Sequence, residues 1–142
     1  MYPYQDSGNS PAARAKDLVS RLTLEEKVAQ LSGIWAYEVL TDFVFDEAKA
    51  RNRMAHGIGQ ITRAGGCTSL KPRDTARLVN RVQRFLKDSM RIFIPAQVHE
   101  ESCAGVLARD ADVFPQALGV AASFSPEIAG EMGAFIREQM AA

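Results

Sequence analysis

The sequence has little of several features that mark particular classes of protein. No apolar run approaches the roughly 20 residues needed to cross a membrane, so we expect no membrane partner. Residues 1–10 contain neither a basic segment nor an apolar one, and therefore do not read as a secretory signal. The two cysteines, Cys67 and Cys103, fit no metal-site spacing and are too few for a disulfide framework. A cytoplasmic location is the default expectation.

An excess of charge of one sign is also missing. Lysine and arginine together number 17, as do aspartate and glutamate, which gives a formal net charge of zero. No basic stripe stands out, so we expect no nucleic-acid partner. The 46% of hydrophobic residues and the length of 142 residues are typical of one globular domain with a core.

Helix starts are recognisable where a capping side chain precedes an apolar pattern. We predict starts at Ser10-Pro11, at the capping box of Thr23, at Asp46, and at Ser125-Pro126. The helix that begins at Asp46 is expected to end near residue 56. The clearest apolar face belongs to a helix before residue 91 and contains Leu78, Val82, Phe85 and Ser89, with Val79 and Leu86 beside it. The final helix places Ile128, Met132, Phe135, Ile136 and Met140 on one side, which we expect to be core.

Two strands are predicted from short apolar runs, over residues 57–62 and 92–98. Gly57 and Gly59 suggest a tight bend or a close approach of two backbones. Residues 34–45 contain the only tryptophan and are interpreted as a loop or short turn anchored by aromatics. Strands alternating with helices indicate a parallel sheet. Because such a sheet needs both faces covered, we expect this chain to be the front part of a larger fold.

The stretch over residues 91–105 has the strongest signal of a functional site. Its apolar start turns abruptly polar at Gln97, His99, Glu100, Glu101 and Ser102. Ligand-handling groups in α/β folds collect just past the carboxyl ends of parallel strands. Two adjacent carboxylates and an imidazole are also costly to bury without partners.

Several segments, taken in order, resemble glycoside hydrolase family 3. They are TLEEKVAQLSG (23–33), GIGQITR (57–63), the Asn80/Gln83 helix leading into RIFIP (91–95), HEESCAG (99–105) and VFPQALGVAASFSPE (113–127). Their order and spacing are similar to the amino-terminal part of bacterial β-glucosidases and β-xylosidases. The resemblance implies an α/β fold that contains the first βα units of a TIM-like (β/α) barrel. Residues 1–142 would be the amino-terminal segment of an incomplete barrel, without the rest of the barrel and the second α/β sandwich domain.

The resemblance also implies an activity for the complete protein: hydrolysis of terminal β-linked glucosides or xylosides by the retaining route, without a cofactor. In the family, the nucleophile is an aspartate late in the barrel, and the acid/base usually comes from the second domain. Neither region is present, so we assign no catalytic residue and expect the chain alone to be inactive. The alternative is a non-catalytic truncated fragment that binds sugar or a partner. An isolated half barrel is also expected to associate or to be loosely packed.

One site residue follows from the resemblance. Glu101 falls on the early acidic position that binds sugar hydroxyls in the subsite next to the nucleophile. Three positions depart from the common pattern: Glu101 itself, where members often have Asp; Ala104, where many have His; and Phe93, where Gly is common.

Other residues near this position have two interpretations each. Glu100 is expected to shape the local field or pair with an arginine, and His99 to be a hydrogen-bonded structural residue rather than a proton shuttle. Arg63 could pair with a carboxylate as readily as with a sugar. Trp35 could stack on a sugar ring or anchor its own loop. Cys103 is expected to be a small buried thiol rather than a nucleophile.

Overall fold

The structure, a computed structural model, describes residues 2–141. A three-stranded parallel sheet lies at its centre, formed by β1 (Gly33–Trp35), β4 (Gln60–Thr62) and β5 (Gln97–His99) in the order β1-β4-β5. Helix α3 (Glu47–Arg53) lies between β1 and β4 in the chain, and helix α4 (Pro72–Ser89) between β4 and β5. Successive strands lying side by side with helical connections are the first βα units of a TIM-like barrel. The predicted α/β fold is confirmed.

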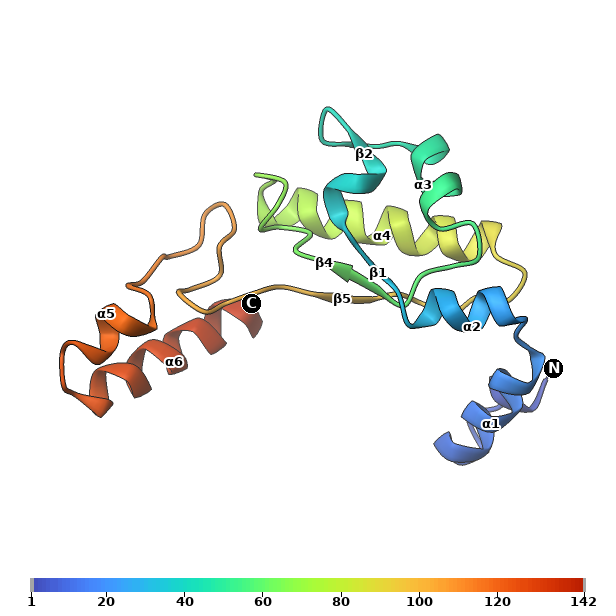
Figure 1. The fold of residues 1–142 in the computed structure, drawn as a ribbon, viewed down its shortest axis with the longest axis horizontal. Coiled ribbons are helices and arrows are strands. Elements are labelled where there is room, and N and C mark those ends of the chain that lie inside the picture. Colours follow the sequence, from blue (N-terminus) through green and yellow to red (C-terminus); the bar gives the residue numbers. More distant parts are fainter. Residues whose placement is uncertain (1, 142) are drawn as a thin grey trace.

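Helix α1 (Pro11–Arg21) lies at one end of the molecule, preceded by the 3-10 helix η1 (Pro3–Gln5). Helices α5 (Ala117–Ala121) and α6 (Pro126–Ala141) extend from the other end, with the sheet and α4 between (Figure 1). No helix within residues 2–141 has the length and apolar character that crossing a membrane would require.

The prediction that residues 34–45 form a loop or short turn is wrong. The structure places β1 at its start, followed by the 3-10 helix η2 (Ala36–Val39) and an antiparallel hairpin of β2 (Leu40–Thr41) and β3 (Val44–Phe45). Strand β1 contains only three residues, too few for the alternation of apolar and polar residues that reveals a strand. Its stability comes from pairing with β4, which is distant in the sequence.

The core lies between the sheet and α4. Ile34, Ile61 and Val98 occupy one row across the three strands, because Ile34 pairs with Ile61 and Ile61 with Val98. This row packs with the buried face of α4, which contains Leu78, Val82, Phe85 and Leu86 as predicted. Ser89, expected on the same face, is half-buried.

The predicted helix starts are confirmed, with capping hydrogen bonds at three of them. Ser10 Oγ accepts a hydrogen bond from the Ala13 amide at the start of α1. Helix α2 (Leu24–Gln30) begins with a complete capping box, in which Thr23 and Glu26 each accept from the other's backbone amide. Asp46 caps α3, but that helix ends at Arg53, before the expected residue 56. Helix α6 begins at Pro126.

The two glycines before β4 have the roles that the sequence suggests. Gly57 has a φ of +91°, a conformation that residues with a Cβ rarely adopt. A Cβ atom on Gly59 would lie 2.0 Å from the carbonyl oxygen of Gln30, so this backbone passes directly against the end of α2. The strand itself is shorter than the predicted 57–62 and begins at Gln60.

Strand β5 lies later in the chain than the predicted 92–98, so Gln97 and His99 are inside the strand rather than past its end. The segment before it is irregular because β4 offers only three residues for pairing, and Pro95 has no amide to donate. Gln83 on α4 fixes this segment instead. Its Nε2 donates to the Ala96 carbonyl oxygen at 2.7 Å, and its Oε1 accepts from the Ala96 amide at 3.2 Å.

The prediction that the apolar side of α6 belongs to the core is wrong for the described part of the chain. Only Ile136 is buried, whereas Ile128, Phe135 and Met140 are 48%, 44% and 47% exposed. The reason is that α6 packs mainly against the short α5 and the Phe114 ring, which forms a T-shaped pair with Phe135, and not against the sheet. Helical spacing correctly predicts an apolar face here, but does not provide the surface that would cover it.

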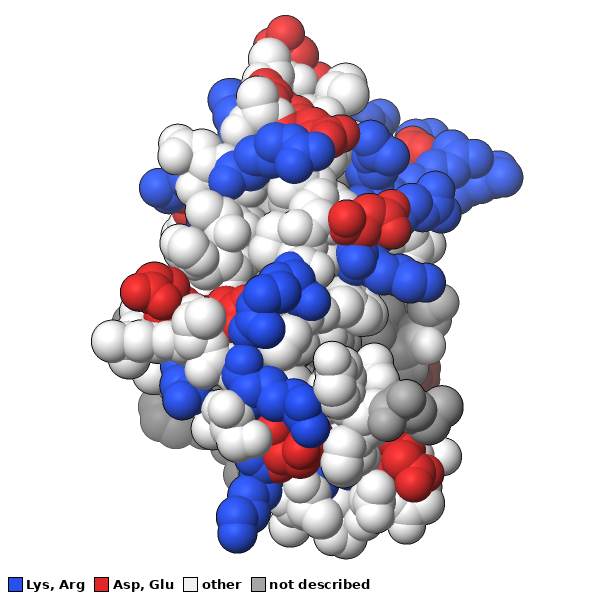
Figure 2. All heavy atoms as spheres, turned by 90° about the vertical axis from the view of Figure 1, so that its right-hand side faces the viewer, with Lys and Arg blue, Asp and Glu red and all other residues white. Residues whose placement is uncertain are grey.

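Helix α4 also has a charged outer side. Its exposed side contains Arg73, Arg77, Arg81, Arg84 and Lys87, opposite the buried face. Acidic residues balance part of this charge: Arg77 pairs with Asp74, and Arg81 with Glu47. A view onto the right-hand side of Figure 1 likewise shows basic side chains interspersed with acidic ones, separated by wide uncharged areas (Figure 2).

Candidate functional site

The carboxyl ends of the three parallel strands lie next to one another and form the candidate site. Trp35, Thr62 and His99 occupy one row at these ends, because Trp35 pairs with Thr62 and Thr62 with His99. Side chains alternate along a strand, so this row faces away from α4, toward the side that is the interior of a barrel. Arg63 and Glu100 follow directly after two of the strands.

The structure brings Trp35, Arg63 and Glu101 together. Arg63 Nη1 lies 3.5 Å from Glu101 Oε2, and the Arg63 guanidinium lies over the Trp35 ring at 5.6 Å from its centroid. The Arg63 side chain is 19% exposed, whereas that of Glu101 is 52% exposed. Of the two interpretations of Arg63, pairing with a carboxylate is the one observed. Trp35 lies at the end of β1, where its ring supports the guanidinium.

The backbone of Arg63 is unusual as well. Its φ of +56° is left-handed, which is uncommon for a residue with a side chain. Its amide donates to the His99 carbonyl oxygen at 2.8 Å and thereby extends the pairing of β4 with β5 by one residue. The left-handed turn then directs the chain into the loop that leads to α4.

Glu100 has a structural role, with backbone amides as its partners in place of the expected arginine. Its Oε1 accepts from the Gly65 amide at 2.7 Å and its Oε2 from the Gly66 amide at 3.2 Å. Successive amides that converge on one carboxylate form a small anion-binding turn. The buried Thr68 hydroxyl donates to the Ala64 carbonyl oxygen at 2.6 Å and stabilises the same turn. The Gly65-Gly66 pair, which closely follows a predicted strand, is a sequence signal that could have indicated this turn.

His99 and Cys103 differ from their expected states. The His99 imidazole has no hydrogen-bond partner within residues 2–141, so the expected hydrogen-bonded structural histidine is not found there. Cys103 is exposed rather than buried. It borders an open, mostly apolar cavity of about 520 Å³ between α5 and α6. Cys67 and Cys103 are both free thiols.

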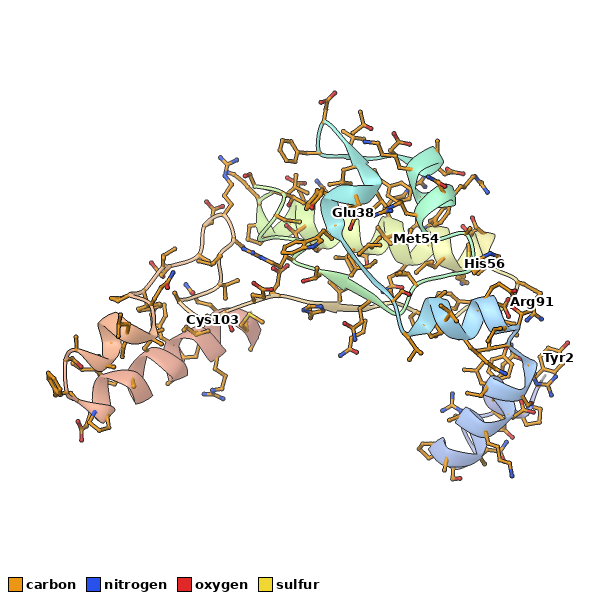
Figure 3. The ribbon with its side chains drawn as sticks, viewed as in Figure 1. Tyr2, Glu38, Met54, His56, Arg91 and Cys103 are labelled. Carbon is orange, nitrogen blue, oxygen red and sulfur yellow. The ribbon has the colours of Figure 1, made fainter. Side chains whose placement is uncertain are left out.

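A separate ion pair lies at the other end of the molecule from Cys103 (Figure 3). Arg91 Nε donates to Glu26 Oε1 at 3.0 Å, and its Nη2 donates both to Glu26 Oε2 and to the Arg21 carbonyl oxygen. The Arg91 guanidinium lowers the pKa of Glu26 below its ordinary value, and burial opposes this effect. Since Glu26 also belongs to the capping box of α2, this pair joins α2 to the segment before β5. Its role is structural.

The described residues contain no group of three or more histidine, cysteine, aspartate or glutamate side chains that could hold a metal ion. Three side chains at the strand ends offer different kinds of contact to a ligand. Glu101 offers a charged hydrogen-bond acceptor, Arg63 offers charged donors, and Trp35 offers an aromatic face.

Comparison with known proteins finds matches to a family and to solved structures. The model of the family described as Glycosyl hydrolase family 3 N terminal domain matches residues 23–142. A similar solved structure is a novel β-glucosidase from Erythrobacter marinus, with 35% sequence identity and a TM-score of 0.67. The match covers 89% of this chain but only 16% of that chain. No curated protein matches. With a family match over nearly the whole described length, this chain belongs to glycoside hydrolase family 3.

Proposed function

We propose that residues 1–142 form the amino-terminal segment of a family 3 (β/α) barrel, and that the rest of the barrel and a second α/β sandwich domain lie outside this chain. The sequential order of three parallel strands supports this assignment, as does the 16% coverage of the Erythrobacter β-glucosidase. The protein that contains both this segment and those regions is called the complete enzyme below.

The complete enzyme is proposed to hydrolyse terminal β-linked glucosides or xylosides by the retaining route. In that route one carboxylate attacks the anomeric carbon and a second acts as acid and base. Family membership and the name of the Erythrobacter β-glucosidase support hydrolysis of a β-glycoside. Both reacting carboxylates would come from outside this chain, and residues 1–142 would supply part of the sugar-binding subsite.

The observation that carries the subsite proposal is the position of Glu101. It lies beyond the carboxyl end of β5, is half exposed, and is paired on one side with Arg63. A carboxylate there can accept hydrogen bonds from sugar hydroxyls, each contributing roughly 1.5 to 3 kcal/mol. Such bonds strengthen as the sugar ring flattens toward an oxocarbenium-like transition state.

The Glu101→Gln variant of the complete enzyme tests this role. Glutamine keeps the shape but removes the charge, so kcat/KM for an aryl β-glucoside or β-xyloside should fall roughly 10-fold to 150-fold. Glu100→Gln is the matched control, because the Glu100 carboxylate is occupied by two backbone amides, and it should lose much less activity. Thermal melts of both variants separate folding defects from catalytic ones. Equal losses in the two variants, or none in Glu101→Gln, would show that the sugar-binding acid is misplaced.

A second experiment tests whether the reacting carboxylates lie outside residues 1–142. Residues 1–142 alone should hydrolyse no aryl β-glucoside, because neither reacting carboxylate is proposed to lie in them. Sequencing of the gene past codon 142 would give the coding sequence of the complete enzyme. That enzyme, once expressed, should hydrolyse the aryl β-glucoside readily. Turnover by residues 1–142 alone would contradict the proposal. A reading frame that stops there would favour the non-catalytic sugar- or partner-binding alternative.

A further inference from the structure

The Arg63 side chain is held more firmly than a surface ion pair requires. Its guanidinium lies over the Trp35 ring, and its backbone adopts a left-handed φ of +56°. Its Nε is buried and has no hydrogen-bond partner among residues 2–141. Residues kept in sparsely populated backbone conformations concentrate at ligand-binding and active sites, where the surrounding structure maintains them. Exposed ion pairs, by contrast, contribute little to stability. Structural pairing with Glu101 alone therefore does not account for this arrangement.

The distance between the two charged groups leaves both able to bind a further partner. A direct charge-assisted hydrogen bond would measure about 2.7 to 2.9 Å. Arg63 Nη1 and Glu101 Oε2 are 3.5 Å apart, and the two side chains form no hydrogen bond. A donor and an acceptor of opposite charge thus lie side by side at the strand ends. A hydroxyl group both donates and accepts, so it can bind to either of them.

Glu100 cannot take the place of Glu101 in this pair. Both of its oxygens accept from the Gly65 and Gly66 amides, which directs its charge into the turn. Gly66 also allows the arginine to lie close, because a Cβ atom there would be 3.0 Å from Arg63 Nε. The turn after β4 therefore fixes one carboxylate and leaves Arg63 facing the other.

We infer that Arg63 is a second sugar-binding residue, which donates to a hydroxyl oxygen adjacent to the hydroxyl that Glu101 binds. The two side chains together would recognise a vicinal diol on the pyranose ring, and Trp35 would position the guanidinium through stacking. This inference rests on the proposed sugar-binding role of Glu101. Arginine suits the task better than lysine, because its planar group can stack on an indole and donate in its own plane at the same time.

A substrate series in the complete enzyme tests the inference. Arg63→Met keeps a long apolar side chain without charge, and it should lower kcat/KM for the full aryl β-glycoside by roughly 10-fold to 150-fold. The same variant is then assayed on aryl glycosides that each lack one hydroxyl. On the substrate that lacks the hydroxyl bound by Arg63, wild type and Arg63→Met should have nearly equal kcat/KM. Wild type and Glu101→Gln should likewise have nearly equal kcat/KM on the substrate that lacks the hydroxyl bound by Glu101, which should be a neighbour of the first.

Two controls make the series interpretable. Arg84→Met removes an exposed arginine from the outer side of α4 and should leave every substrate unaffected. Arg63→Lys keeps the charge and should retain more activity than Arg63→Met on the full substrate. If a thermal melt shows that Arg63→Met does not fold, the assays on the deoxy substrates are carried out with Arg63→Lys instead.

The outcomes distinguish the inference from the proposal on which it rests. Equal losses from Arg63→Met on every deoxy substrate would mean that the arginine only supports the fold, and would overturn the inference while leaving Glu101 in place. If wild type and Arg63→Met have equal kcat/KM on a substrate whose missing hydroxyl is not adjacent to the one bound by Glu101, the vicinal-diol assignment is overturned. If Glu101→Gln has no effect on any substrate, the proposed role of Glu101 fails, and the paired recognition fails with it.

Discussion

Glu100 and Glu101 are neighbours in the sequence, but their carboxylates have different surroundings. The two Glu100 oxygens accept hydrogen bonds from the Gly65 and Gly66 amides. A glutamine at position 100 has only one oxygen, so one of these amides would lose its acceptor. We therefore expect Glu100→Gln to lower the free energy of unfolding by about 1 to 3 kcal/mol, and Glu101→Gln to lower it by much less. Urea denaturation of the two variants of the complete enzyme measures the difference. Equal stability would contradict the role of Glu100 in the turn.

The pH dependence of stability can be predicted at a second residue, Glu26. Its pKa in the folded chain is lowered by the Arg91 guanidinium from an ordinary value near 4.5, so the folded state binds fewer protons than the unfolded state around that pH. The stabilisation from this pair is therefore fully present above about pH 4.5 and is lost as the pH falls through the folded pKa. Arg91→Gln removes the largest cause of this lowering, whereas the hydrogen bond from the Thr23 amide remains.

Urea midpoints measured from neutral to acidic pH check this expectation. Wild type should exceed Arg91→Gln in stability near neutral pH, and the gap should narrow in acid, because protonated Glu26 no longer pairs with Arg91. The capping box remains in both proteins, so the comparison isolates the ion pair. Two curves that stay parallel through the acidic range would show that Arg91 has no influence on Glu26.

At the residue scale, the sequence indicates chemical types but not partners. Glu101 can be selected because it stands in a family motif after a strand. Its pairing with Arg63 and the stacking of Arg63 on Trp35 join three segments that only the parallel register brings together. The exposure of Cys103 is equally unpredictable from sequence, because it depends on what packs around the thiol.

Elements also differ in how far they can be predicted from sequence. The capping box of Thr23 and the apolar face of α4 are local patterns, and both are found where the sequence places them. Strand β1 and the start of β5 are determined by non-local pairing with the three residues of β4, so the predictions for them fail. Short strands of this kind give little periodicity to detect.

The close contact between α2 and β4 gives a prediction at the scale of elements. A methyl group on Gly59 would collide with the Gln30 carbonyl oxygen, so Gly59→Ala must push α2 away from the sheet. We expect a loss of about 1 to 3 kcal/mol, or more if the backbone cannot move. Gly133→Ala is the matched control, since no atom of residues 2–141 lies within 4 Å of its added methyl group.

The control variant should be more stable than wild type, by about 0.5 to 1 kcal/mol, because alanine loses less backbone entropy than glycine in a helix interior. Thermal melts of the two variants, carried out in the complete enzyme, give the two shifts. Destabilisation of similar size by both would mean that the contact between Gly59 and Gln30 does not constrain the fold.

The whole molecule has surfaces that its own residues do not cover. Within residues 2–141, β1 and β5 each pair along one edge only, so both have free backbone amides and carbonyl groups on the other. Leu31, Leu118 and Phe124 are 91%, 86% and 93% exposed, and the apolar side of α6 lies open. In a closed barrel such edges pair with neighbouring strands, and helix faces pack against neighbouring helices.

Residues 1–142 alone should therefore associate in solution or remain loosely packed. Burial of the exposed leucines and of Phe124 between copies would favour association, and the free edges of β1 and β5 offer further pairing. Light scattering after size exclusion should show species larger than a monomer, and the thermal midpoint should rise with protein concentration. The complete enzyme is the control, because its remaining strands and helices are proposed to cover these surfaces. A monodisperse monomer with a sharp, concentration-independent transition would contradict the prediction and would mean that residues 1–142 fold as an independent unit.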